Sequence, residues 1–234
     1  PKASSGAADL SYLYQAIDSI KLYADSEALI IIKSTVPPGT SDRVKNYLNN
    51  QEIFLRVSSN PEFLREGNAV DDFINPDRIV FGVSDEKSKS ILEKIYQDFS
   101  QRGVKIVTTN CVTSELIKYA SNSFLACKIA FINEMADLSE QLGANIDDLS
   151  YTIGLDRRIG GSFLKAGPGF GGSCFPKDIM ALKYLAQTVG SKSLILNAVI
   201  EANNNRPTTM LTKIRKIIGK LEKTHIALLG LTYK

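Results

Sequence analysis

Cys174 is the residue of this chain whose type and surroundings most clearly indicate a chemical reaction. It lies in the segment GPGFGGSCFPKD, residues 167–178, where glycines precede it and Pro176 suits the first helical position. The free amides of a helix start, together with the positive end of the helix dipole, favour a thiolate over a thiol. The pattern therefore predicts a nucleophilic cysteine on a glycine-rich loop at a helix N-terminus.

Two simpler interpretations of this segment compete with the nucleophile. Isolated cysteines are often core residues, as we expect for Cys111 and Cys127, but Cys174 is surrounded by glycines, a proline and charges. The string GPGFGG at residues 167–172 also matches the dinucleotide pattern G-x-G-x-x-G. That pattern requires a preceding buried strand, whereas residues 157–162 are polar and interrupted by glycine. We therefore interpret the glycines as a loop that a ligand approaches closely.

The chain has a single histidine, His225, which opens an apolar run and which we expect at a strand edge. Catalytic arrangements that pair cysteine or serine with histidine are therefore disfavoured, and proton transfer falls to lysine, carboxylates or water. Three cysteines and one histidine without paired spacing predict no metal site.

Composition sets the outer bounds on function. The 234 residues are 44% hydrophobic and 23% charged, which is typical of one large or two small globular domains. We expect no membrane span and no nucleic-acid partner, because no apolar run is long enough and the basic residues are scattered among acidic ones. The unpaired cysteines favour a reducing compartment, the cytoplasm. The chain starts without methionine, and we expect it to be a piece of a longer protein.

The first half of the chain alternates between helical and strand patterns. Strands are expected at residues 28–33, 55–58, 79–83 and 104–107, and helices at residues 9–23, 41–48 and 86–100. This alternation predicts an α/β fold with a largely parallel, doubly wound sheet of the Rossmann-like kind. Ligands of such sheets bind beyond the carboxyl ends of the strands, where the loops at residues 34–37 and 59–63 are expected.

The second half is predicted to be helical and to begin with one long helix over residues 113–142. A stripe of apolar residues recurs along it every three or four positions: Leu116, Ala120, Phe124, Cys127, Phe131, Met135, Leu138 and Leu142. A second set lies off that stripe: Ile117, Leu125, Ile129 and Ile132. So much apolar surface indicates a domain core or a dimer interface. Shorter helices are expected at residues 145–153, 177–189, 194–205 and 207–221, followed by a strand at 226–229.

Polar residues on this framework leave alternatives open. Lys118 and Asn122 are four residues apart and share a helix face, which is either solvated or supplies donors to an oxyanion formed at a thiol. Glu62 and Glu66 belong either to the first turn of a helix, which favours negative charge, or to a site with a general base beside a ligand contact.

Five separated segments together resemble the nucleotide-sugar dehydrogenase family: KSTVPPGT, SNPEFLREG, ELIKYASNSFLA, DRRIGGSFLKAGPGFGGSCFPKD and GLTYK. The resemblance covers nearly the whole chain, and the sequences of the segments are most similar to those of the branch that acts on UDP-glucose. Enzymes of the family that act on GDP-mannose or UDP-N-acetylmannosamine are the alternatives. The resemblance implies three domains. They are a partial NAD-binding Rossmann-like domain over residues 1–110, a helical central dimerisation domain over 111–222 and the start of a truncated UDP-sugar-binding domain over 223–234.

The glycine fingerprint and the ribose-binding acidic residue that open the family's cofactor domain are absent from this sequence. We therefore expect the segment alone to bind NAD poorly.

The resemblance also implies a reaction, in which UDP-glucose, two NAD and water give UDP-glucuronate and two NADH. The catalytic residues it implies are Cys174 as nucleophile, Lys118 and Asn122 as donors to the substrate oxygen, Asp178 acting through water with Lys118, and Glu62 as base for the final hydrolysis. Those it implies at NAD or its surroundings are Thr35, Glu66 and Lys177. The residues that it implies at the UDP-sugar are Glu62, Phe63, Leu64, Arg65, Glu66, Lys118, Asn122, Phe163, Leu164, Lys165, Ala166, Gly167, Gly171 and Lys234. The resemblance also implies a homodimer, in which Arg158 reaches the substrate of the partner subunit.

Functions of other classes remain open from the residues alone. The chain could be a noncatalytic dimerisation fragment, because the long helix is its most strongly patterned element. A thiol acyltransferase would use Cys174 without producing NADH. A two-electron hydroxy-acid dehydrogenase would leave Cys174 without a role.

Overall fold

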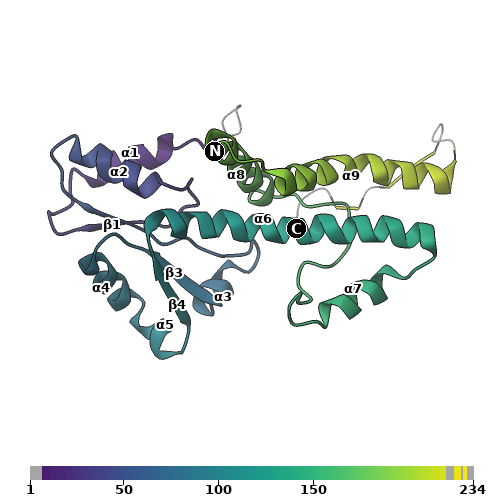
Figure 1. Cartoon of the computed structure of the whole chain (residues 1–234), viewed down its shortest axis with the longest axis horizontal. Coiled ribbons are helices and arrows are strands. Elements are labelled where there is room, and N and C mark those ends of the chain that lie inside the picture. Colours follow the sequence, from purple (N-terminus) through teal and green to yellow (C-terminus); the bar gives the residue numbers. More distant parts are fainter. Residues whose placement is uncertain (1–6, 220–223, 228, 231–234) are drawn as a thin grey trace. The chain divides into compact units, whose positions relative to one another are not determined.

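The computed structural model of the chain describes residues 7–219, 224–227, 229 and 230 (Figure 1). It divides into two compact units, Pro1–Ala120 and Ser121–Lys234. The boundary falls within the longest helix, α6 (Cys111–Leu142), so that this helix contributes its first turns to unit 1 and the remainder to unit 2. Lys234, for which the sequence predicts a substrate contact, lies outside the described residues.

Unit 1 is built on a four-stranded sheet with the strand order β1–β2–β3–β4. The strands are β1 (Leu29–Ile32), β2 (Arg56–Ser59), β3 (Arg78–Gly82) and β4 (Lys105–Thr109). β1 is parallel to β2 and β3 is parallel to β4, whereas β2 and β3 meet antiparallel at the pair Ser59–Gly82. The predicted α/β fold is therefore confirmed, with one antiparallel junction in a sheet that is otherwise parallel.

Helices of unit 1 connect these strands and cover them with apolar side chains. They are α1 (Ser11–Ile20), α2 (Thr40–Asn49), α3 (Ala69–Ile74), α4 (Glu86–Ile95) and α5 (Gln97–Gln101). One buried cluster joins α1 and α2 to β1 and β2: Ile17, Ile30, Ile32, Val36, Val44, Leu48, Leu55 and Val57. A second joins α4 to β3: Ile79, Phe81, Leu92 and Tyr96. These clusters fix the ends of the strands from which the site loops leave.

The single helix predicted over residues 86–100 is two helices in the structure, because Tyr96 leaves helical geometry with φ −102° and ψ 18°. Its ring packs on Phe81 at 5.4 Å between centroids, and its hydroxyl donates to Asn60 Oδ1 at 2.5 Å. The periodicity of the sequence could not reveal this break, since the tertiary contacts of one side chain cause it.

Gly82 allows the start of α6 to pack against the end of β3. A Cβ atom at this position would stand 2.6 Å from Ser114 Cβ and 2.9 Å from Cys111 Cα, closer than real Cβ contacts. The Cys111 thiol also donates to the Gly82 carbonyl at 3.2 Å. The position of α6 in unit 1, and with it that of Lys118, thus depends on a residue without a side chain.

The regular secondary structure in the described residues of unit 2 is helical. After α6 come α7 (Ile146–Gly154), α8 (Phe175–Thr188) and α9 (Leu194–Ile218). Its buried core joins α6, α8, α9 and the loop before α8: Ala126, Phe170, Ile179 and Val199. The helical domain predicted for the second half is therefore present.

The two helices predicted over residues 194–205 and 207–221 form the single helix α9, with Pro207 inside it. Proline cannot donate a helical hydrogen bond and normally ends or kinks a helix. Here the residues on both sides are held to α6, because Arg206 and Lys213 both form ion pairs with Asp137. These contacts offset the missing bond, and the prediction of a break was wrong.

The apolar stripe predicted on α6 is largely uncovered in the single chain. Five of its residues have between 41% and 73% of their surface exposed: Leu116, Phe124, Phe131, Leu138 and Leu142. The buried residues Ala126 and Ile132 lie off the stripe and contribute to the interior. Contacts among the described residues therefore do not make the stripe part of a domain core, and the other expectation, a dimer interface, stays a prediction.

The strand predicted at residues 226–229 is not found in the described part of that segment, where Ile226, Ala227 and Leu229 have no strand conformation and His225 is exposed. A short apolar run becomes a strand only where a neighbouring edge supplies its hydrogen bonds, and the run itself does not encode such an edge. The remainder of residues 223–234 lies largely outside the described residues.

Two kinds of site are absent from the described residues. No described helix combines the length and hydrophobicity that crossing a membrane would demand. Within the same residues, no group of three or more histidine, cysteine or acidic side chains is arranged to bind a metal ion. All three cysteines are free thiols.

Candidate active site

In unit 1, Lys118 and Glu62 form an ion pair at the end of β2. Lys118 is only 4% exposed, and its Nζ lies 3.1 Å from Glu62 Oε1 and 5.4 Å from the centre of the Phe63 ring. The second oxygen of Glu62 accepts from the Leu64 amide at 2.6 Å. A buried ammonium requires such a partner because an unpaired charge is costly to remove from water. The side chain of Glu62 remains 30% exposed, so the carboxylate can also meet water.

The loop that carries Glu62 is held in place by Asn60, which is almost fully buried. The Asn60 amide donates to the Ile32 carbonyl, and its side-chain Nδ2 donates to the Val80 carbonyl, both at 2.9 Å. These bonds join the loop to β1 and β3, so the turn after β2 is fixed at its first residue. Residues 61–65 are not helical and α3 starts at Ala69, so the alternative that places Glu62 and Glu66 in a first helical turn is wrong.

The other predicted substrate residues of this loop differ in their surroundings. Phe63 contacts two cations, because Arg78 Cζ lies 3.9 Å and Lys118 Nζ 5.4 Å from the centre of its ring. Arg65 is instead paired with Asp72, at 2.5 Å between Nη2 and Oδ1, and this hydrogen bond holds the pKa of Asp72 well below its usual range. Leu64 is half-buried, and Glu66 is exposed.

Thr35 lies half-buried in the loop that follows β1. Because Ile32 of β1 pairs in parallel register with Ser59 of β2, the loops that follow these two strands start side by side. Doubly wound sheets bind dinucleotides at such strand ends. The pyrophosphate would need a glycine-rich turn, and residues 7–28 contain no glycine.

Glu115 anchors the far end of the Thr35 loop and was missed by the sequence reasoning. It is 2% exposed, and it accepts from the Gly39 amide at 2.6 Å and from the Ser41 amide and hydroxyl at 2.8 and 2.6 Å. Burial raises the pKa of Glu115. Its spacing of three residues from Lys118 in α6 was the available signal, because it places both side chains on the buried face.

In unit 2, Cys174 is the residue that precedes α8, as its sequence context predicts. It caps the helix with φ −100° and ψ −65°, and Pro176 is the second residue of the helix. The thiol is half-buried, with Sγ 3.6 Å from the Ser173 hydroxyl oxygen. Phe175, the next residue, packs against Phe163 and Phe170 at 6.1 Å between ring centres. The predicted cysteine at a helix start is thereby confirmed.

Asp178 lies one helical turn after Cys174, and its amide donates to the Cys174 carbonyl at 2.9 Å. It is fully buried. One carboxylate oxygen accepts from Asn122 Nδ2 at 2.6 Å, and the other lies 2.5 Å from Lys177 Nζ. These bonds connect the start of α8 to α6 in the neighbourhood of the thiol.

The predicted sugar-lining segment, residues 163–167, leads into the cysteine loop. Phe163 has φ 64°, a left-handed conformation that is uncommon for an aromatic residue and is often found at functional sites. Leu164 is buried, Lys165 is exposed, and Ala166 and Gly167 are half-buried, as is Gly171 farther along.

Arg158 lies in the turn before this segment and points away from the buried core. Its side chain is 89% exposed and pairs with Asp156 at 2.6 Å, which lowers the pKa of that carboxyl. Lys128 of α6 holds the same turn by donating to the carbonyls of Ile159 and Gly160 at 3.1 and 3.0 Å.

The structure thus assembles the predicted catalytic residues into two groups, one in each unit. Glu62 and Lys118 are paired in unit 1, while Cys174, Asp178 and Asn122 lie together in unit 2. Lys118 and Asn122 are one turn apart in the continuous helix α6. Chemically, the first group offers a partly exposed carboxylate and a buried cation. The second offers a thiol at a helix start and, one turn later in the same helix, a hydrogen-bonded carboxylate.

Comparison with known proteins identifies the family. Residues 1–100 match the NAD binding domain of the UDP-glucose/GDP-mannose dehydrogenase family, and residues 112–205 match its central domain. The chain belongs to this family. Membership in the UDP-glucose/GDP-mannose dehydrogenases confirms the resemblance indicated by the five sequence segments, and it confirms a Rossmann-like domain followed by a central domain.

Individual members of the family align along the whole chain. The UDP-glucose 6-dehydrogenase of Rickettsia bellii is 56% identical over 235 residues, which cover 100% of this chain and 54% of that protein. A UDP-glucose dehydrogenase structure from Pyrobaculum islandicum is 39% identical with a TM-score of 0.86, covering 94% of this chain and 51% of that one. A UDP-D-ManNAc dehydrogenase structure from Pyrococcus horikoshii is 28% identical with a TM-score of 0.80, covering 92% of this chain and 52% of that one. The chain therefore spans about half the length of the dehydrogenases it matches.

Proposed function

We propose that the protein oxidises UDP-glucose to UDP-glucuronate at a site that includes Cys174, consuming two NAD and one water and releasing two NADH. The observation that carries the proposal is the half-buried thiol at the start of α8, one turn before a buried carboxylate that is bonded to Asn122. The identity of 56% with an enzyme named UDP-glucose 6-dehydrogenase supports UDP-glucose over GDP-mannose or UDP-N-acetylmannosamine.

Cys174 divides the reaction into two oxidations. Each bound NAD accepts one hydride, so two are needed to take a primary alcohol to the level of a carboxylate. Between the oxidations, Sγ of Cys174 forms a bond to the aldehyde carbon and the carbonyl oxygen takes a proton, which gives a thiohemiacetal. Oxidation of that adduct gives a thioester, and the reactive aldehyde stays attached to the protein throughout.

Water completes the reaction by attacking the thioester carbon. The carbon–sulfur bond then breaks, the acid leaves, and the thiol of Cys174 is restored. We assign the role of general base, which takes the proton of the attacking water, to Glu62. The partial exposure of its carboxylate supports this role, because a base of this kind must meet water. Lys118 offers its charge, and Asn122 its amide, to the oxygen on which negative charge develops.

Asp178 and Lys118 are the groups that we assign to removal of the alcohol proton, through an intervening water. Asp178 is suited to this task because Asn122 and Lys177 fix its carboxylate in a fully buried position. Thr35, Glu66 and Lys177 would contact NAD or order the residues around it. Residues 163–167 and Gly171, with the Glu62 loop, would line the UDP-sugar.

Counting NADH tests the proposal. The purified full-length protein should produce two NADH for each UDP-glucose consumed. The aldehyde stays bound to Cys174 and is not released before the second oxidation. NADH is measured by its absorbance, and UDP-glucuronate by chromatography, with GDP-mannose and UDP-N-acetylmannosamine as competing substrates. A ratio of one would remove the thioester route, and faster turnover of either competitor would move the assignment to another branch of the family.

We further propose that the chain forms a homodimer through α6. The uncovered stripe presents Phe124, Phe131 and Leu138 at intervals of seven residues, and an apolar surface of this kind is stable in water when a second copy covers it. A dimer would also give the exposed guanidinium of Arg158 a role, because it could reach the substrate of the partner subunit.

Placing charge on the stripe should separate the dimer. The double variant Phe131→Asp/Leu138→Asp should elute as a monomer at micromolar concentrations, because each subunit would bury two carboxylates against apolar partners. Light scattering after size-exclusion chromatography measures the mass. Val189→Asp is the matched control, since Val189 is an exposed apolar residue outside the stripe. A dimer that persists in the double variant would place the interface elsewhere.

A further inference from the structure

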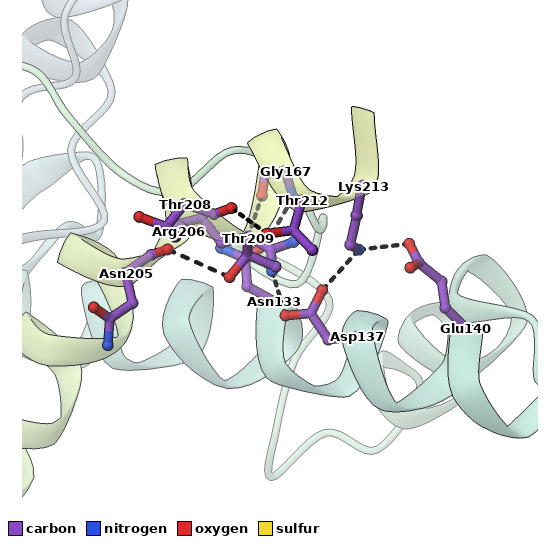
Figure 2. Close-up of polar contacts among 10 residues, drawn as sticks. All are labelled: Asn133, Asp137, Glu140, Gly167, Asn205, Arg206, Thr208, Thr209, Thr212 and Lys213. Carbon is purple, nitrogen blue, oxygen red and sulfur yellow. Dashed lines mark hydrogen bonds and ion pairs between the residues drawn. The ribbon is translucent and has the colours of Figure 1, made fainter. Parts of the chain in front are cut away.

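The turn at residues 167–170, four residues before Cys174, is held by side chains through its backbone. The Gly167 amide donates to Asn133 Oδ1 at 2.8 Å, and the Gly167 carbonyl accepts from Arg206 Nε at 3.0 Å (Figure 2). The Phe170 amide donates to Asn203 Oδ1 at 2.8 Å, and the Phe170 carbonyl accepts from Asn203 Nδ2 at 3.0 Å. The backbone amide and carbonyl of Gly167 and of Phe170 are therefore all hydrogen-bonded to side chains that are distant in the sequence.

The side chains that hold the turn are themselves fixed. Arg206 is 6% exposed, and its Nη1 lies 2.6 Å from Asp137 Oδ2. Figure 2 shows Lys213 bridging Asp137 and Glu140, with Nζ 2.7 and 2.5 Å from their carboxylates. Burial would raise the pKa of Asp137, but the two cations outweigh it and lower that pKa, so the pair is charged at neutral pH. Side chains locked in this way impose a fixed geometry on what they bind.

Gly169 makes the contact with Asn203 possible. Its φ of +110° is a conformation that glycine adopts without strain, and a Cβ atom there would stand 2.7 Å from Asn203 Oδ1. The glycine in the middle of the turn is thus matched to the amide that holds the end of the turn.

The turn is connected to the thiol through aromatic packing. Phe170 is buried, and its ring meets that of Phe175 edge to face at 6.1 Å. Phe175 directly follows Cys174 and begins α8. A shift of the turn would therefore move the residue that orients Cys174 at the helix start, and it would also move the sugar-lining segment that ends at Gly167.

We propose that Asn203, Arg206 and Asn133 are positioning residues, which fix the 167–170 turn and thereby the approach of Cys174 to its substrate. The inference rests on the proposed role of Cys174. The residues bind the backbone of the turn rather than the reacting atoms, so they act on catalysis through geometry. Misplacing reacting groups by about 1 Å can cost on the order of 10²-fold in rate.

Asn203→Ala in the full-length protein tests the proposal, with Asn204→Ala as the matched control. Asn204 is an exposed asparagine next to Asn203 in the same helix. In Asn203→Ala, amide hydrogen exchange in peptides spanning residues 164–172 should rise about tenfold, which corresponds to the loss of one or two hydrogen bonds. Alkylation of Cys174 by iodoacetamide should become at least about threefold faster, while that of Cys127 stays unchanged. We expect kcat for UDP-glucose oxidation to fall about 10- to 100-fold with the KM for NAD unchanged.

Arg206→Lys provides a second variant if Asn203→Ala folds poorly. A lysine keeps the positive charge beside Asp137 but lacks the Nε that donates to Gly167. Lys213→Met is its control, because it breaks ion pairs of the same cluster without touching the turn. Arg206→Lys should lower kcat more than Lys213→Met does at equal thermal stability.

Several outcomes would overturn the positioning role. They are unchanged exchange in residues 164–172, unchanged alkylation of Cys174, or loss of kcat that merely follows loss of stability in all four variants. Exchange and alkylation need no turnover, so they decide the inference even if the wild-type protein fails to oxidise UDP-glucose. Failure of the wild-type protein to oxidise UDP-glucose would instead contradict the proposed function.

Discussion

Replacing Cys174 by serine should stop the release of UDP-glucuronate by the full-length protein. A hydroxyl at the start of α8 is a far weaker nucleophile than a thiolate, so neither the aldehyde adduct nor the acyl intermediate should form at a useful rate. We expect kcat to fall by on the order of 10⁴-fold or more, because loss of a covalent nucleophile costs about 10⁶-fold in the enzyme where it has been dissected.

The measurement combines NADH production with mass spectrometry of the protein. Wild-type protein trapped during turnover should carry the mass of a sugar nucleotide on Cys174, and the serine variant should carry none. Cys127→Ala is the control, because Cys127 is a half-buried packing residue of α6. Turnover of Cys174→Ser within tenfold of wild type would contradict covalent catalysis by this residue.

Replacing Lys118 by methionine should have the next largest effect. The variant removes the buried cation that pairs with Glu62 at 3.1 Å and that we assign to the substrate oxygen. Loss of one preorganised donor to a developing oxyanion costs about 10²- to 10³-fold in kcat. The fold should survive, because the side chain of Glu62 is 30% exposed and water can solvate it once the cation is gone.

Steady-state kinetics and thermal denaturation separate the two effects. Lys21→Met serves as the matched control, since it deletes an ion pair with Asp18 in the same unit at 2.7 Å without touching the proposed site. Lys118→Arg should recover part of the activity, because it restores the charge with a bulkier and planar group. Equal kcat in Lys118→Met and wild type would exclude Lys118 from the chemistry.

The elements that the sequence predicted well are those whose signal is local. Runs such as Leu29–Ile32 are short, apolar and rich in β-branched residues, and they place strands to within one or two residues. The glycines before Cys174 and Pro176 after it likewise predicted a helix start, which α8 confirms. In each case the residues that form the feature are neighbours in the chain.

The features that sequence reasoning missed are held by distant partners. Pro207 reads as a helix break, yet ion pairs from Arg206 and Lys213 to α6 keep α9 continuous. The partners of Glu115 and Asn203 could not be predicted, because both side chains bind backbone groups, which every residue possesses. Their roles become visible only when Gly39 and Phe170 are seen beside them.

The seven-residue spacing of Phe124, Phe131 and Leu138 has a consequence for the handedness of the proposed dimer. A straight α-helix has 3.6 residues per turn, so a seven-residue repeat drifts about 20° around the helix axis with each repeat. Two copies of α6 can keep these side chains in contact only by winding slightly around one another in the left-handed sense. The spacing therefore favours a crossing angle of about +20° over a steep crossing.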